Sequence, residues 1–448
     1  MSRRPLRIAV IGAGWAGLAA AVRAVERGAE VTLFEMAPRA GGRARAWAEP
    51  AAPSDGAAGG PWIDNGQHIL IGAYSRTLDL MQTVGVDLHR AFDRRPLCLQ
   101  HADGSRLAWG TGAPTAAFLE ALWTATQWSR RDRLAFLAWA VGWQLRRFRC
   151  GPQLTVRALA RSLPDSVRLR LIEPLCVAAL NTPAEVASGT VFLRVLQDAL
   201  AGGRGASDLL LPRQPLQALL PDPAVAWLRA RGSPVHLGRR IQALQVSNGG
   251  VAVDGESFDA AVLATTSVEA ARLAEPLAPA WAAQARSLAF ESIVTVWLDA
   301  PGWRLPAPML ALDEGPAQPA QFLFDHGTLA DAPGRLTAVI SGANQWLEEG
   351  TAAIESAVAA QVGALGLGPP GSAPRPVRTI IERRATFRCT PGVHRPGVRV
   401  APGLVAAADY VEGPYPATLE GAVRAGERAV ALLPEPRSTG PAEPRTRA

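Results

Sequence analysis

The chain has 448 residues, 48% of them hydrophobic and 19% charged, which is enough for two sizeable cores and too long for one. Its formal net charge is +7, but the basic residues are spread along the chain without interleaved aromatics, so we expect no nucleic-acid partner. Every basic residue is arginine, and the absence of lysine excludes both pyridoxal-phosphate chemistry through a Schiff base and a Walker A loop.

A strand, a glycine-rich turn and a helix are predicted at the N-terminus. Residues 8–11 form an apolar run typical of a buried parallel strand, and a helix opens behind it and runs to Arg27. The turn between them contains Gly12, Gly14, Trp15, Ala16 and Gly17. Such glycines allow a tight turn, close approach of a pyrophosphate and close packing of helix on strand, with free helix amides facing the phosphates.

A second strand at 31–34 ends in Glu35, where a carboxylate would accept a hydrogen bond from a ribose hydroxyl. A second glycine pair with flanking arginines follows, made of Arg39, Gly41, Gly42 and Arg43. Guanidinium groups are planar, bidentate donors to phosphate. In these features the chain resembles the FAD-binding proteins of the amine oxidase and phytoene desaturase superfamily. The resemblance implies FAD as cofactor, with 41–43 along its pyrophosphate.

The segment 115–148 is rich in tryptophan and other large apolar residues interleaved with arginines. Indole rings and guanidinium groups together suit a bilayer interface. A pair of core helices is the alternative for this segment. We predict a helical layer that partly faces lipid, so that a membrane surface is an expected partner.

Two further motifs belong to the same resemblance. The strand at 260–266 implies a return of the chain to the cofactor domain, with Ile241 beside the adenine, although an isoleucine in a strand is usually core. Near the C-terminus, a strand at 404–408 stops at Asp409, and a helix preceded by Thr418 and Leu419 runs to Leu433. There the resemblance implies an acid at the ribityl chain and a helix N-terminus facing the flavin.

The predicted fold class is α/β, with a Rossmann-like FAD-binding domain interleaved with an α+β substrate domain. The resemblance assigns 1–95, 230–275 and 390–434 to the FAD domain and 96–229 and 276–389 to the substrate domain. The tail 435–448 is Pro-rich, polar and predicted to be disordered. The four cysteines and six histidines show no ligand spacing, so no metal site is expected.

Arg3 and Arg4 precede an apolar stretch, but cleavage of a leader there would destroy the first strand of the cofactor site. No apolar run reaches the ~20 residues that cross a bilayer. We therefore expect a cytoplasmic protein that could associate peripherally with the cytoplasmic membrane.

One internal segment narrows the family. Residues 62–74, together with 382–387 and 410–422, resemble the hydroxysqualene dehydroxylases of hopanoid biosynthesis. The resemblance implies that reduced flavin gives hydride to an allylic-type carbon as the C–O bond of hydroxysqualene breaks, in a site with apolar walls and an acid. His68 and Glu412 are the tentative acids, His68 having the better matched ordinary pKa. His68 is equally well a packed residue, and Asp64 is expected to orient backbone.

Three alternatives remain open. A carotenoid or phytoene desaturase would share the fold and run the redox step in the opposite direction. An amine oxidase would usually use a lysine that this chain lacks. A non-enzymatic isoprenoid escort protein would lack an intact flavin site, whereas both terminal flavin motifs are present. The electron donor is not identified, because no second nucleotide fingerprint is found.

Overall fold

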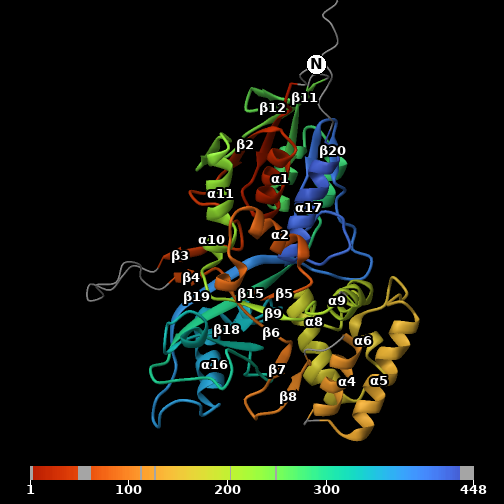
Figure 1. Cartoon of the computed structure of the whole chain (residues 1–448), viewed down its shortest axis with the longest axis vertical. Helices are drawn as coiled ribbons and strands as arrows, with labels where there is room; N and C mark the ends of the chain where they lie inside the picture. Colours follow the sequence, from red (N-terminus) through yellow and green to blue (C-terminus); the bar gives the residue numbers. More distant parts are fainter. Residues whose placement is uncertain are drawn as a thin grey trace, which may run out of the picture.

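The computed structural model describes residues 4–48, 62–110, 114–125, 128–201, 203–247 and 250–433. A mainly parallel sheet with helices occupies one end of the molecule, and an antiparallel sheet with further helices occupies the other (Figure 1). The predicted tail at 435–448 lies outside the described residues.

The first sheet has six strands, in the order β10 (Val235–Leu237), β2 (Glu30–Glu35), β1 (Arg7–Ile11), β14 (Ala260–Leu263), β21 (Leu404–Ala406) and β20 (Arg399–Ala401). Every neighbouring pair is parallel except β20 with β21. The apolar run of β1 suits a strand that is covered on both faces. The strands of this sheet come from three separate stretches of the chain. The predicted α/β class is confirmed.

Two helices from opposite ends of the chain lie side by side at this sheet, α1 (Trp15–Glu26) and α17 (Leu419–Ala431) (Figure 1). Gly426 permits their close approach, because a methyl group there would lie 2.3 Å from the Ala16 carbonyl oxygen. Both helices were predicted, and each ends within two residues of its predicted end.

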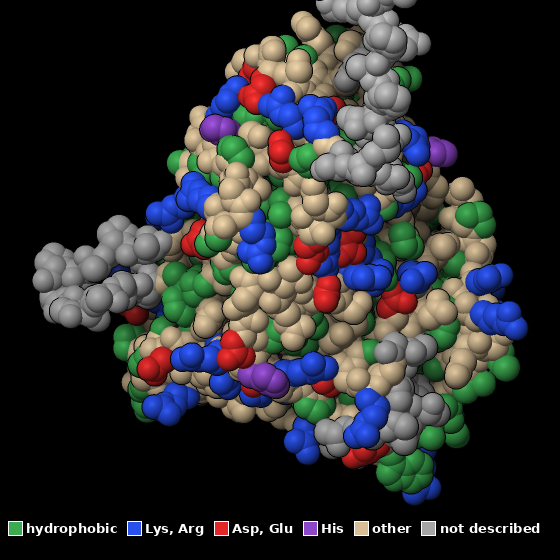
Figure 2. Space-filling model, turned by 45° about the horizontal axis from the view of Figure 1, so that its top comes forward, with side chains coloured by type: hydrophobic (Ala, Val, Ile, Leu, Met, Phe, Trp, Pro, Cys, Tyr) green, Lys and Arg blue, Asp and Glu red, His purple; other side chains and the backbone are tan. Residues whose placement is uncertain are grey.

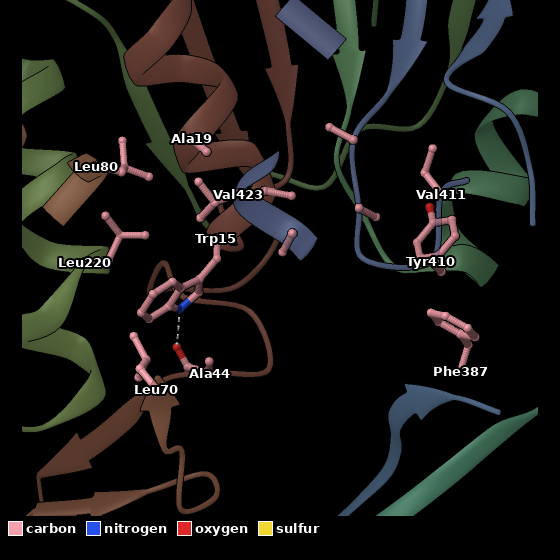
Figure 3. Packing of buried hydrophobic residues seen from close by; sticks show 14 of the residues in the cluster. Trp15, Ala19, Ala44, Leu70, Leu80, Leu220, Phe387, Tyr410, Val411 and Val423 are labelled. Atoms are coloured by element: carbon pink, nitrogen blue, oxygen red, sulfur yellow. Dashed lines mark hydrogen bonds between the residues drawn. The ribbon is translucent and has the colours of Figure 1, made fainter. Parts of the chain in front are cut away.

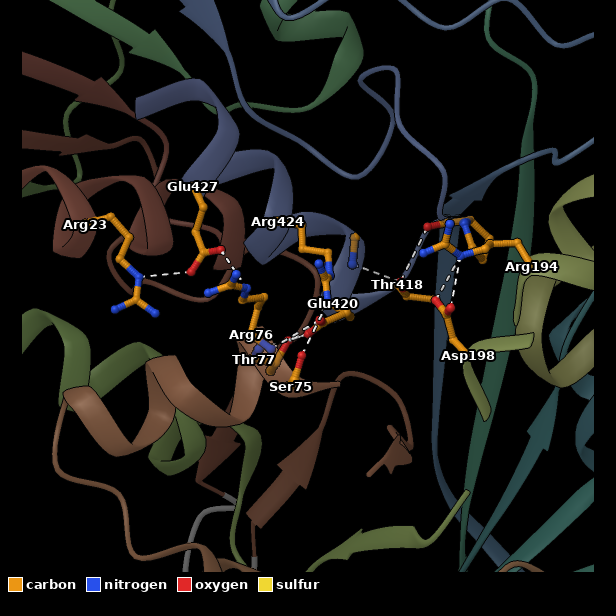
Figure 4. Close-up of polar contacts among 12 residues, drawn as sticks. Arg23, Ser75, Arg76, Thr77, Arg194, Asp198, Thr418, Glu420, Arg424 and Glu427 are labelled. Carbon is orange, nitrogen blue, oxygen red and sulfur yellow. Dashed lines mark hydrogen bonds and ion pairs between the residues drawn. The ribbon is translucent and has the colours of Figure 1, made fainter. Parts of the chain in front are cut away.

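A buried carboxylate fastens α17 to α2 (Ser75–Thr83). Glu420 is 1% exposed and accepts hydrogen bonds from Thr77 N at 2.9 Å and Thr77 Oγ1 at 2.7 Å. Arg424 Nε donates to the same carboxylate at 2.7 Å (Figure 4). The first turns of the two helices therefore share one charged anchor.

The second sheet is antiparallel, in the order β16 (Met309–Ala311), β17 (Phe322–Asp325), β18 (Arg335–Ile340), β15 (Phe290–Asp299) and β19 (Arg375–Phe387). Along β15, Val294 and Val296 pack with α16 (Thr351–Gly363) in a separate core. Thr295 alternates to the opposite face. That face also carries Val339 and Phe322, which lie in register with Thr295 and belong to the larger core shared with the parallel sheet.

Four small sheets complete the strands of the described residues. They are β3 (Ala46–Ala48) with β4 (Trp62–Asp64); β5 (Leu70–Ile71), β9 (Leu209–Pro212) and β6 (Phe92–Arg95); β7 (Cys98–Gln100) with β8 (Arg106–Ala108); and β11 (Leu244–Ser247), β12 (Gly250–Val253) and β13 (Glu256–Phe258). The remaining helices are α3 (Leu88–Ala91), α4 (Pro114–Thr124), α5 (Arg130–Leu145), α6 (Val156–Leu159), α7 (Asp165–Val167), α8 (Glu173–Leu180), α9 (Gly189–Ala201), α10 (Leu216–Leu219), α11 (Pro221–Ala230), α12 (Ser267–Ala274), α13 (Pro279–Arg286), α14 (His326–Leu329) and α15 (Trp346–Glu349), with a π-helical turn at Arg168–Ile172.

The aromatic-rich segment 115–148 forms α4 and α5, and much of its aromatic surface is internal. Trp128, Phe136 and Trp143 are buried, and Trp139 Nε1 donates to Leu159 O at 2.8 Å. These rings pack edge to face or stacked in one row. The alternative of core helices therefore holds for the inner face of α5. In the part of the chain that the structure describes, no helix is long and apolar enough to span a bilayer.

Candidate functional site

The turn between β1 and α1 requires glycine at two positions. Gly12 has φ +107°, and a methyl group there would lie 2.3 Å from Ala264 O on the adjoining β14 side. A methyl group on Gly17 would lie 1.9 Å from Gly12 O. Because glycine has no side chain at these positions, α1 can lie close to the sheet, as the sequence predicted.

Gly14 differs because no described residue fills the space beside it. It has ordinary extended backbone, and the nearest heavy atom to a methyl group there would be Gly42 Cα at 4.0 Å. Among the described residues no side chain caps α1 at Gly14, and the first turn has no acidic residue. An uncapped helix N-terminus with open space before it has amides available for an anion. This geometry fits the pyrophosphate of a dinucleotide.

The glycine pair 41–42 lies against this turn. Gly41 N donates to Ala13 O at 2.8 Å, and Gly14 and Gly41 form a parallel bridge. Both Gly41 and Gly42 have positive φ. The structure thus brings the two predicted glycine motifs together beside one helix N-terminus.

The Trp15 side chain is part of the core. It is buried, and its Nε1 donates to Ala44 O at 3.0 Å (Figure 3). The ring therefore ties the start of α1 to the loop after Gly42. Only the backbone of Trp15 remains for the predicted cofactor contact, and Ala16 beside it is likewise buried.

Glu35 ends β2, as predicted, and both of its carboxylate oxygens hold backbone. Oε2 accepts from Ala13 N at 2.7 Å and Oε1 from Ala37 N at 2.8 Å. Residues 238–241 pass next to it, since Arg239 N donates to Glu35 O at 2.8 Å. Ile241 is buried in this neighbourhood. Arg39 is exposed and lines a cavity of about 460 Å³ with α11 and Leu237.

Arg43 and Asp409 meet although 366 residues separate them. Arg43 Nη2 donates to Asp409 Oδ1 at 2.5 Å, and Arg43 Nη1 donates to Ala385 O at 2.6 Å at the end of β19. Burial lowers the pKa of Arg43, but Asp409 outweighs it and holds that pKa above its ordinary value. This guanidinium therefore joins the two sheets, and its contact with the cofactor phosphates stays a prediction.

Thr418 and Leu419 lie at the start of α17. Thr418 Oγ1 accepts from Gly421 N at 3.0 Å, so Thr418 is the N-cap of the helix that begins at Leu419. Leu419 is half-buried. Thr418 is therefore the cap of this helix and Leu419 is in its first turn. The remaining backbone amides of that turn are possible donors to a ligand.

His68 lies at the face of the antiparallel sheet that carries Thr295. A methyl group on Gly66 would lie 3.4 Å from His68 Cε1 and 3.8 Å from Thr295 Oγ1, so the two side chains approach Gly66 together. His68 Nδ1 is 2.9 Å from Gly66 O, which assigns the proton to Nδ1. Burial lowers the pKa of His68, and the Arg43 charge lowers it further. A neutral imidazole of this tautomer accepts at Nε2, which weakens the predicted role of an acid.

Two buried polar atoms near this point lack hydrogen-bond partners within the described ranges, Thr295 Oγ1 and Gln67 Oε1. Buried polar atoms are nearly always paired, so orphaned ones indicate a missing ligand. Thr295 was missed from the sequence, because a threonine within an apolar strand gives no local signal. Asn65 was missed as well; its Nδ2 donates to Arg43 O at 2.8 Å and to Glu382 Oε2 at 3.4 Å.

Glu412 and Asp64 make other contacts. Glu412 is exposed and pairs with Arg428 at 2.9 Å, so the structure does not bring it to His68, and its catalytic role stays a prediction. Asp64 is buried and accepts from Leu216 N at 2.9 Å, as expected for a residue that orients backbone. Burial raises the pKa of Asp64 to about 7.

Comparison with known proteins gives a consistent result. The model of the flavin containing amine oxidoreductase family matches residues 15–433. A hydroxysqualene dehydroxylase of Rhodopseudomonas palustris is 30% identical over 445 residues, 95% of this chain and 97% of that protein. Another, from Sinorhizobium fredii, is 28% identical over 96% of this chain and 98% of its own length. An oxidoreductase structure from Methanosarcina mazei matches with a TM-score of 0.72 at 16% identity, covering 95% of this chain and 100% of that one, which shows the fold.

Proposed function

The chain belongs to the flavin containing amine oxidoreductases, a family of FAD-dependent enzymes, and from this membership we propose that it converts hydroxysqualene to squalene. The observation that carries the proposal is the near full-length similarity to two hydroxysqualene dehydroxylases. In the reaction a C–H bond forms as a C–O bond breaks, the substrate carbon gains two electrons, and the hydroxyl group takes a proton and leaves as water.

FAD supplies those two electrons when it is bound in its reduced form. We propose that its phosphates lie at the start of α1, supported by the open space at Gly14 and the uncapped helix. The proposed cofactor residues remain those of the sequence: Gly12, Gly14, Trp15, Ala16, Gly17, Glu35, Arg39, Gly41, Gly42, Arg43, Ile241, Asp409, Thr418 and Leu419. Trp15 contributes backbone alone, and Arg43 and Asp409 act as a pair.

The substrate hydroxyl, we propose, binds between His68 and Thr295. The orphaned Thr295 hydroxyl is a hydrogen-bond donor to the departing oxygen, and the neutral His68 orients the bound alcohol by accepting a hydrogen bond from it at Nε2. The proton that turns the departing hydroxyl into water comes from the solvent. The surrounding face carries Val339 and Phe322, which suits a hydrocarbon and excludes water from the reacting carbon.

The test is anaerobic incubation of the FAD-loaded protein, in its chemically reduced form with hydroxysqualene and in its oxidised form with phytoene or a primary amine, followed by product analysis. We expect squalene from hydroxysqualene, with return of the oxidised flavin absorbance. Products from oxidised protein with phytoene or the amine, and none from hydroxysqualene, would overturn the proposal in favour of a desaturase or an amine oxidase.

The variant Thr295→Val tests the substrate contact. It removes an unpaired hydroxyl, so stability should hold or rise, whereas kcat/KM should fall about tenfold, equivalent to ~1.4 kcal/mol. Thr379→Val is the matched control, because the Thr379 hydroxyl donates to Glu355 at 2.6 Å on the same sheet. Thr379→Val should lose stability and keep its turnover. If Thr295→Val kept its turnover and lost stability instead, Thr295 would be excluded from the site.

A further inference from the structure

Helices α4 and α5 carry large apolar side chains that no described residue covers. On α5, Leu134 is 67%, Val141 43% and Leu145 81% exposed, at spacings of seven and four residues that place them on one side of a helix. On α4, Leu119 is 47% and Trp123 79% exposed. We call these five side chains the α4/α5 apolar face. They are five of the ten large hydrophobic side chains found exposed in the described residues, and they lie on two helices that contact each other, so exposed apolar side chains are concentrated here.

The two helices are fixed relative to each other at this surface. Arg133, in the first turn of α5, donates to Trp123 O at 2.8 Å and to Ala125 O at 2.6 Å at the end of α4. A capping box between Ser129 and Asp132 defines the start of α5. The opposite side of α5 packs inward through Phe136 and Trp143. Folding therefore uses the inner side, and the exposed apolar side has no role in the core.

Cations without carboxylate partners among the described residues lie at both ends of α5. Arg130 and Arg131 lie at its start, and Arg146, Arg147 and Arg149 at its end, all of them exposed. None of these five forms an ion pair with a described residue, whereas arginines elsewhere commonly do, as Arg23, Arg94 and Arg240 show. In the lower right part of Figure 2, hydrophobic and basic side chains stand next to one another. In Figure 1 these helices lie at the end opposite β11 and β12.

We propose that the α4/α5 apolar face docks on an anionic lipid bilayer, with the apolar side chains at the acyl boundary and the five arginines on lipid phosphates. Guanidinium groups are suited to phosphate, and basic residues near an anionic leaflet are attracted to it. A second copy is the poorer occupant, because a two-fold contact would bring together two sets of arginines that lack carboxylate partners. A polyene substrate dissolves in lipid, so a bilayer is the partner that the proposed function would need. The reason for docking rests on that proposed function, whereas the docking surface does not.

The test is co-sedimentation of the FAD-loaded protein with vesicles, in the absence of substrate. Vesicles of phosphatidylcholine alone are compared with vesicles that also contain phosphatidylglycerol. We expect at least tenfold tighter binding to the anionic vesicles, weakened by salt. Because no turnover is measured, failure of the proposed reaction would leave this result unaffected.

Two variants locate the contact. Leu134→Gln combined with Leu145→Gln removes apolar surface, and Arg130→Gln combined with Arg146→Gln removes charge; each should weaken vesicle binding at least tenfold. The control is Met36→Gln combined with Val268→Gln, which changes two exposed apolar side chains elsewhere. Flavin absorbance and melting temperature should be unchanged in all three. Equal binding by every variant, or a dimer in sedimentation velocity that the variants dissociate, would overturn the proposal.

Discussion

A methyl group on Gly17 would come within 1.9 Å of the Gly12 carbonyl oxygen, whereas one on Gly14 would find its nearest neighbour at 4.0 Å. The first contact is set by the fold, because it involves two backbone segments of the same turn. The second position is open among the described residues, and we propose that a ligand explains its lack of a side chain. On this proposal the two glycines separate folding from cofactor binding.

We expect Gly17→Ala to destabilise the fold and Gly14→Ala to leave the apoprotein stable within about 0.5 kcal/mol. Gly14→Ala should instead weaken FAD binding at least tenfold, or ~1.4 kcal/mol, because the methyl group occupies the phosphate approach. Thermal unfolding of the apoprotein and flavin titration measure the two effects. Unchanged FAD affinity in Gly14→Ala would show that the phosphates bind elsewhere.

Asp64 gives a pH-dependent prediction. Burial raises its folded-state pKa from 3.8 to about 7, so its contribution to stability is fully present below pH ~4 and is lost as the pH rises through 7. Relative to the wild type, Asp64→Asn should gain up to about 4 kcal/mol in free energy of unfolding across that range. Urea titrations at several pH values measure this difference; a constant difference would contradict the buried, protonated carboxyl.

At the scale of single residues, the sequence indicated which residues gather at the start of α1 better than what each one contacts. Gly12, Gly17 and Glu35 follow a local spacing that fixes their geometry. The partners of Arg43 and Glu412, which are Asp409 and Arg428, were not predicted, because they are chosen by tertiary packing. No local pattern encodes such a choice.

Among the elements, the pairing of α2 with α17 depends on Glu420. Glu420→Ala would leave Thr77 N and Thr77 Oγ1 buried without their acceptor and Arg424 without its partner. We expect the free energy of unfolding to fall by about 3–5 kcal/mol, as for other buried pairs that lose one member. Glu256→Ala, in the exposed pair with Arg7, should cost less than about 1 kcal/mol. Similar losses in both variants would contradict the anchor.

The strands and helices around the cofactor site were predictable because each has a strong local signal, an apolar run for β1 and β14 and glycine or threonine at the starts of α1 and α17. The strand order of the antiparallel sheet could not be predicted in the same way, since its register depends on partners distant in sequence. For residues 115–148 the composition predicted a helical layer that partly faces lipid. Periodicity alone did not separate the buried Trp143 from the exposed Trp123.

For the whole molecule, the parallel sheet and its helices draw on the N-terminus, the middle and the C-terminus of the chain, and Arg43 joins this unit to β19 of the other sheet. We propose that the predicted division, with 1–95, 230–275 and 390–434 around FAD, describes one cofactor unit. A ligand that binds such a unit stabilises all three segments at once.

The most direct test of the account is a single anaerobic turnover in deuterated water, in which flavin reoxidation and squalene are quantified in the same sample. We expect one squalene for each flavin reoxidised, carrying one deuterium on the former carbinol carbon, because the flavin hydride position exchanges with solvent. Flavin that stays reduced in the presence of hydroxysqualene, or that is reoxidised without squalene, would contradict the account.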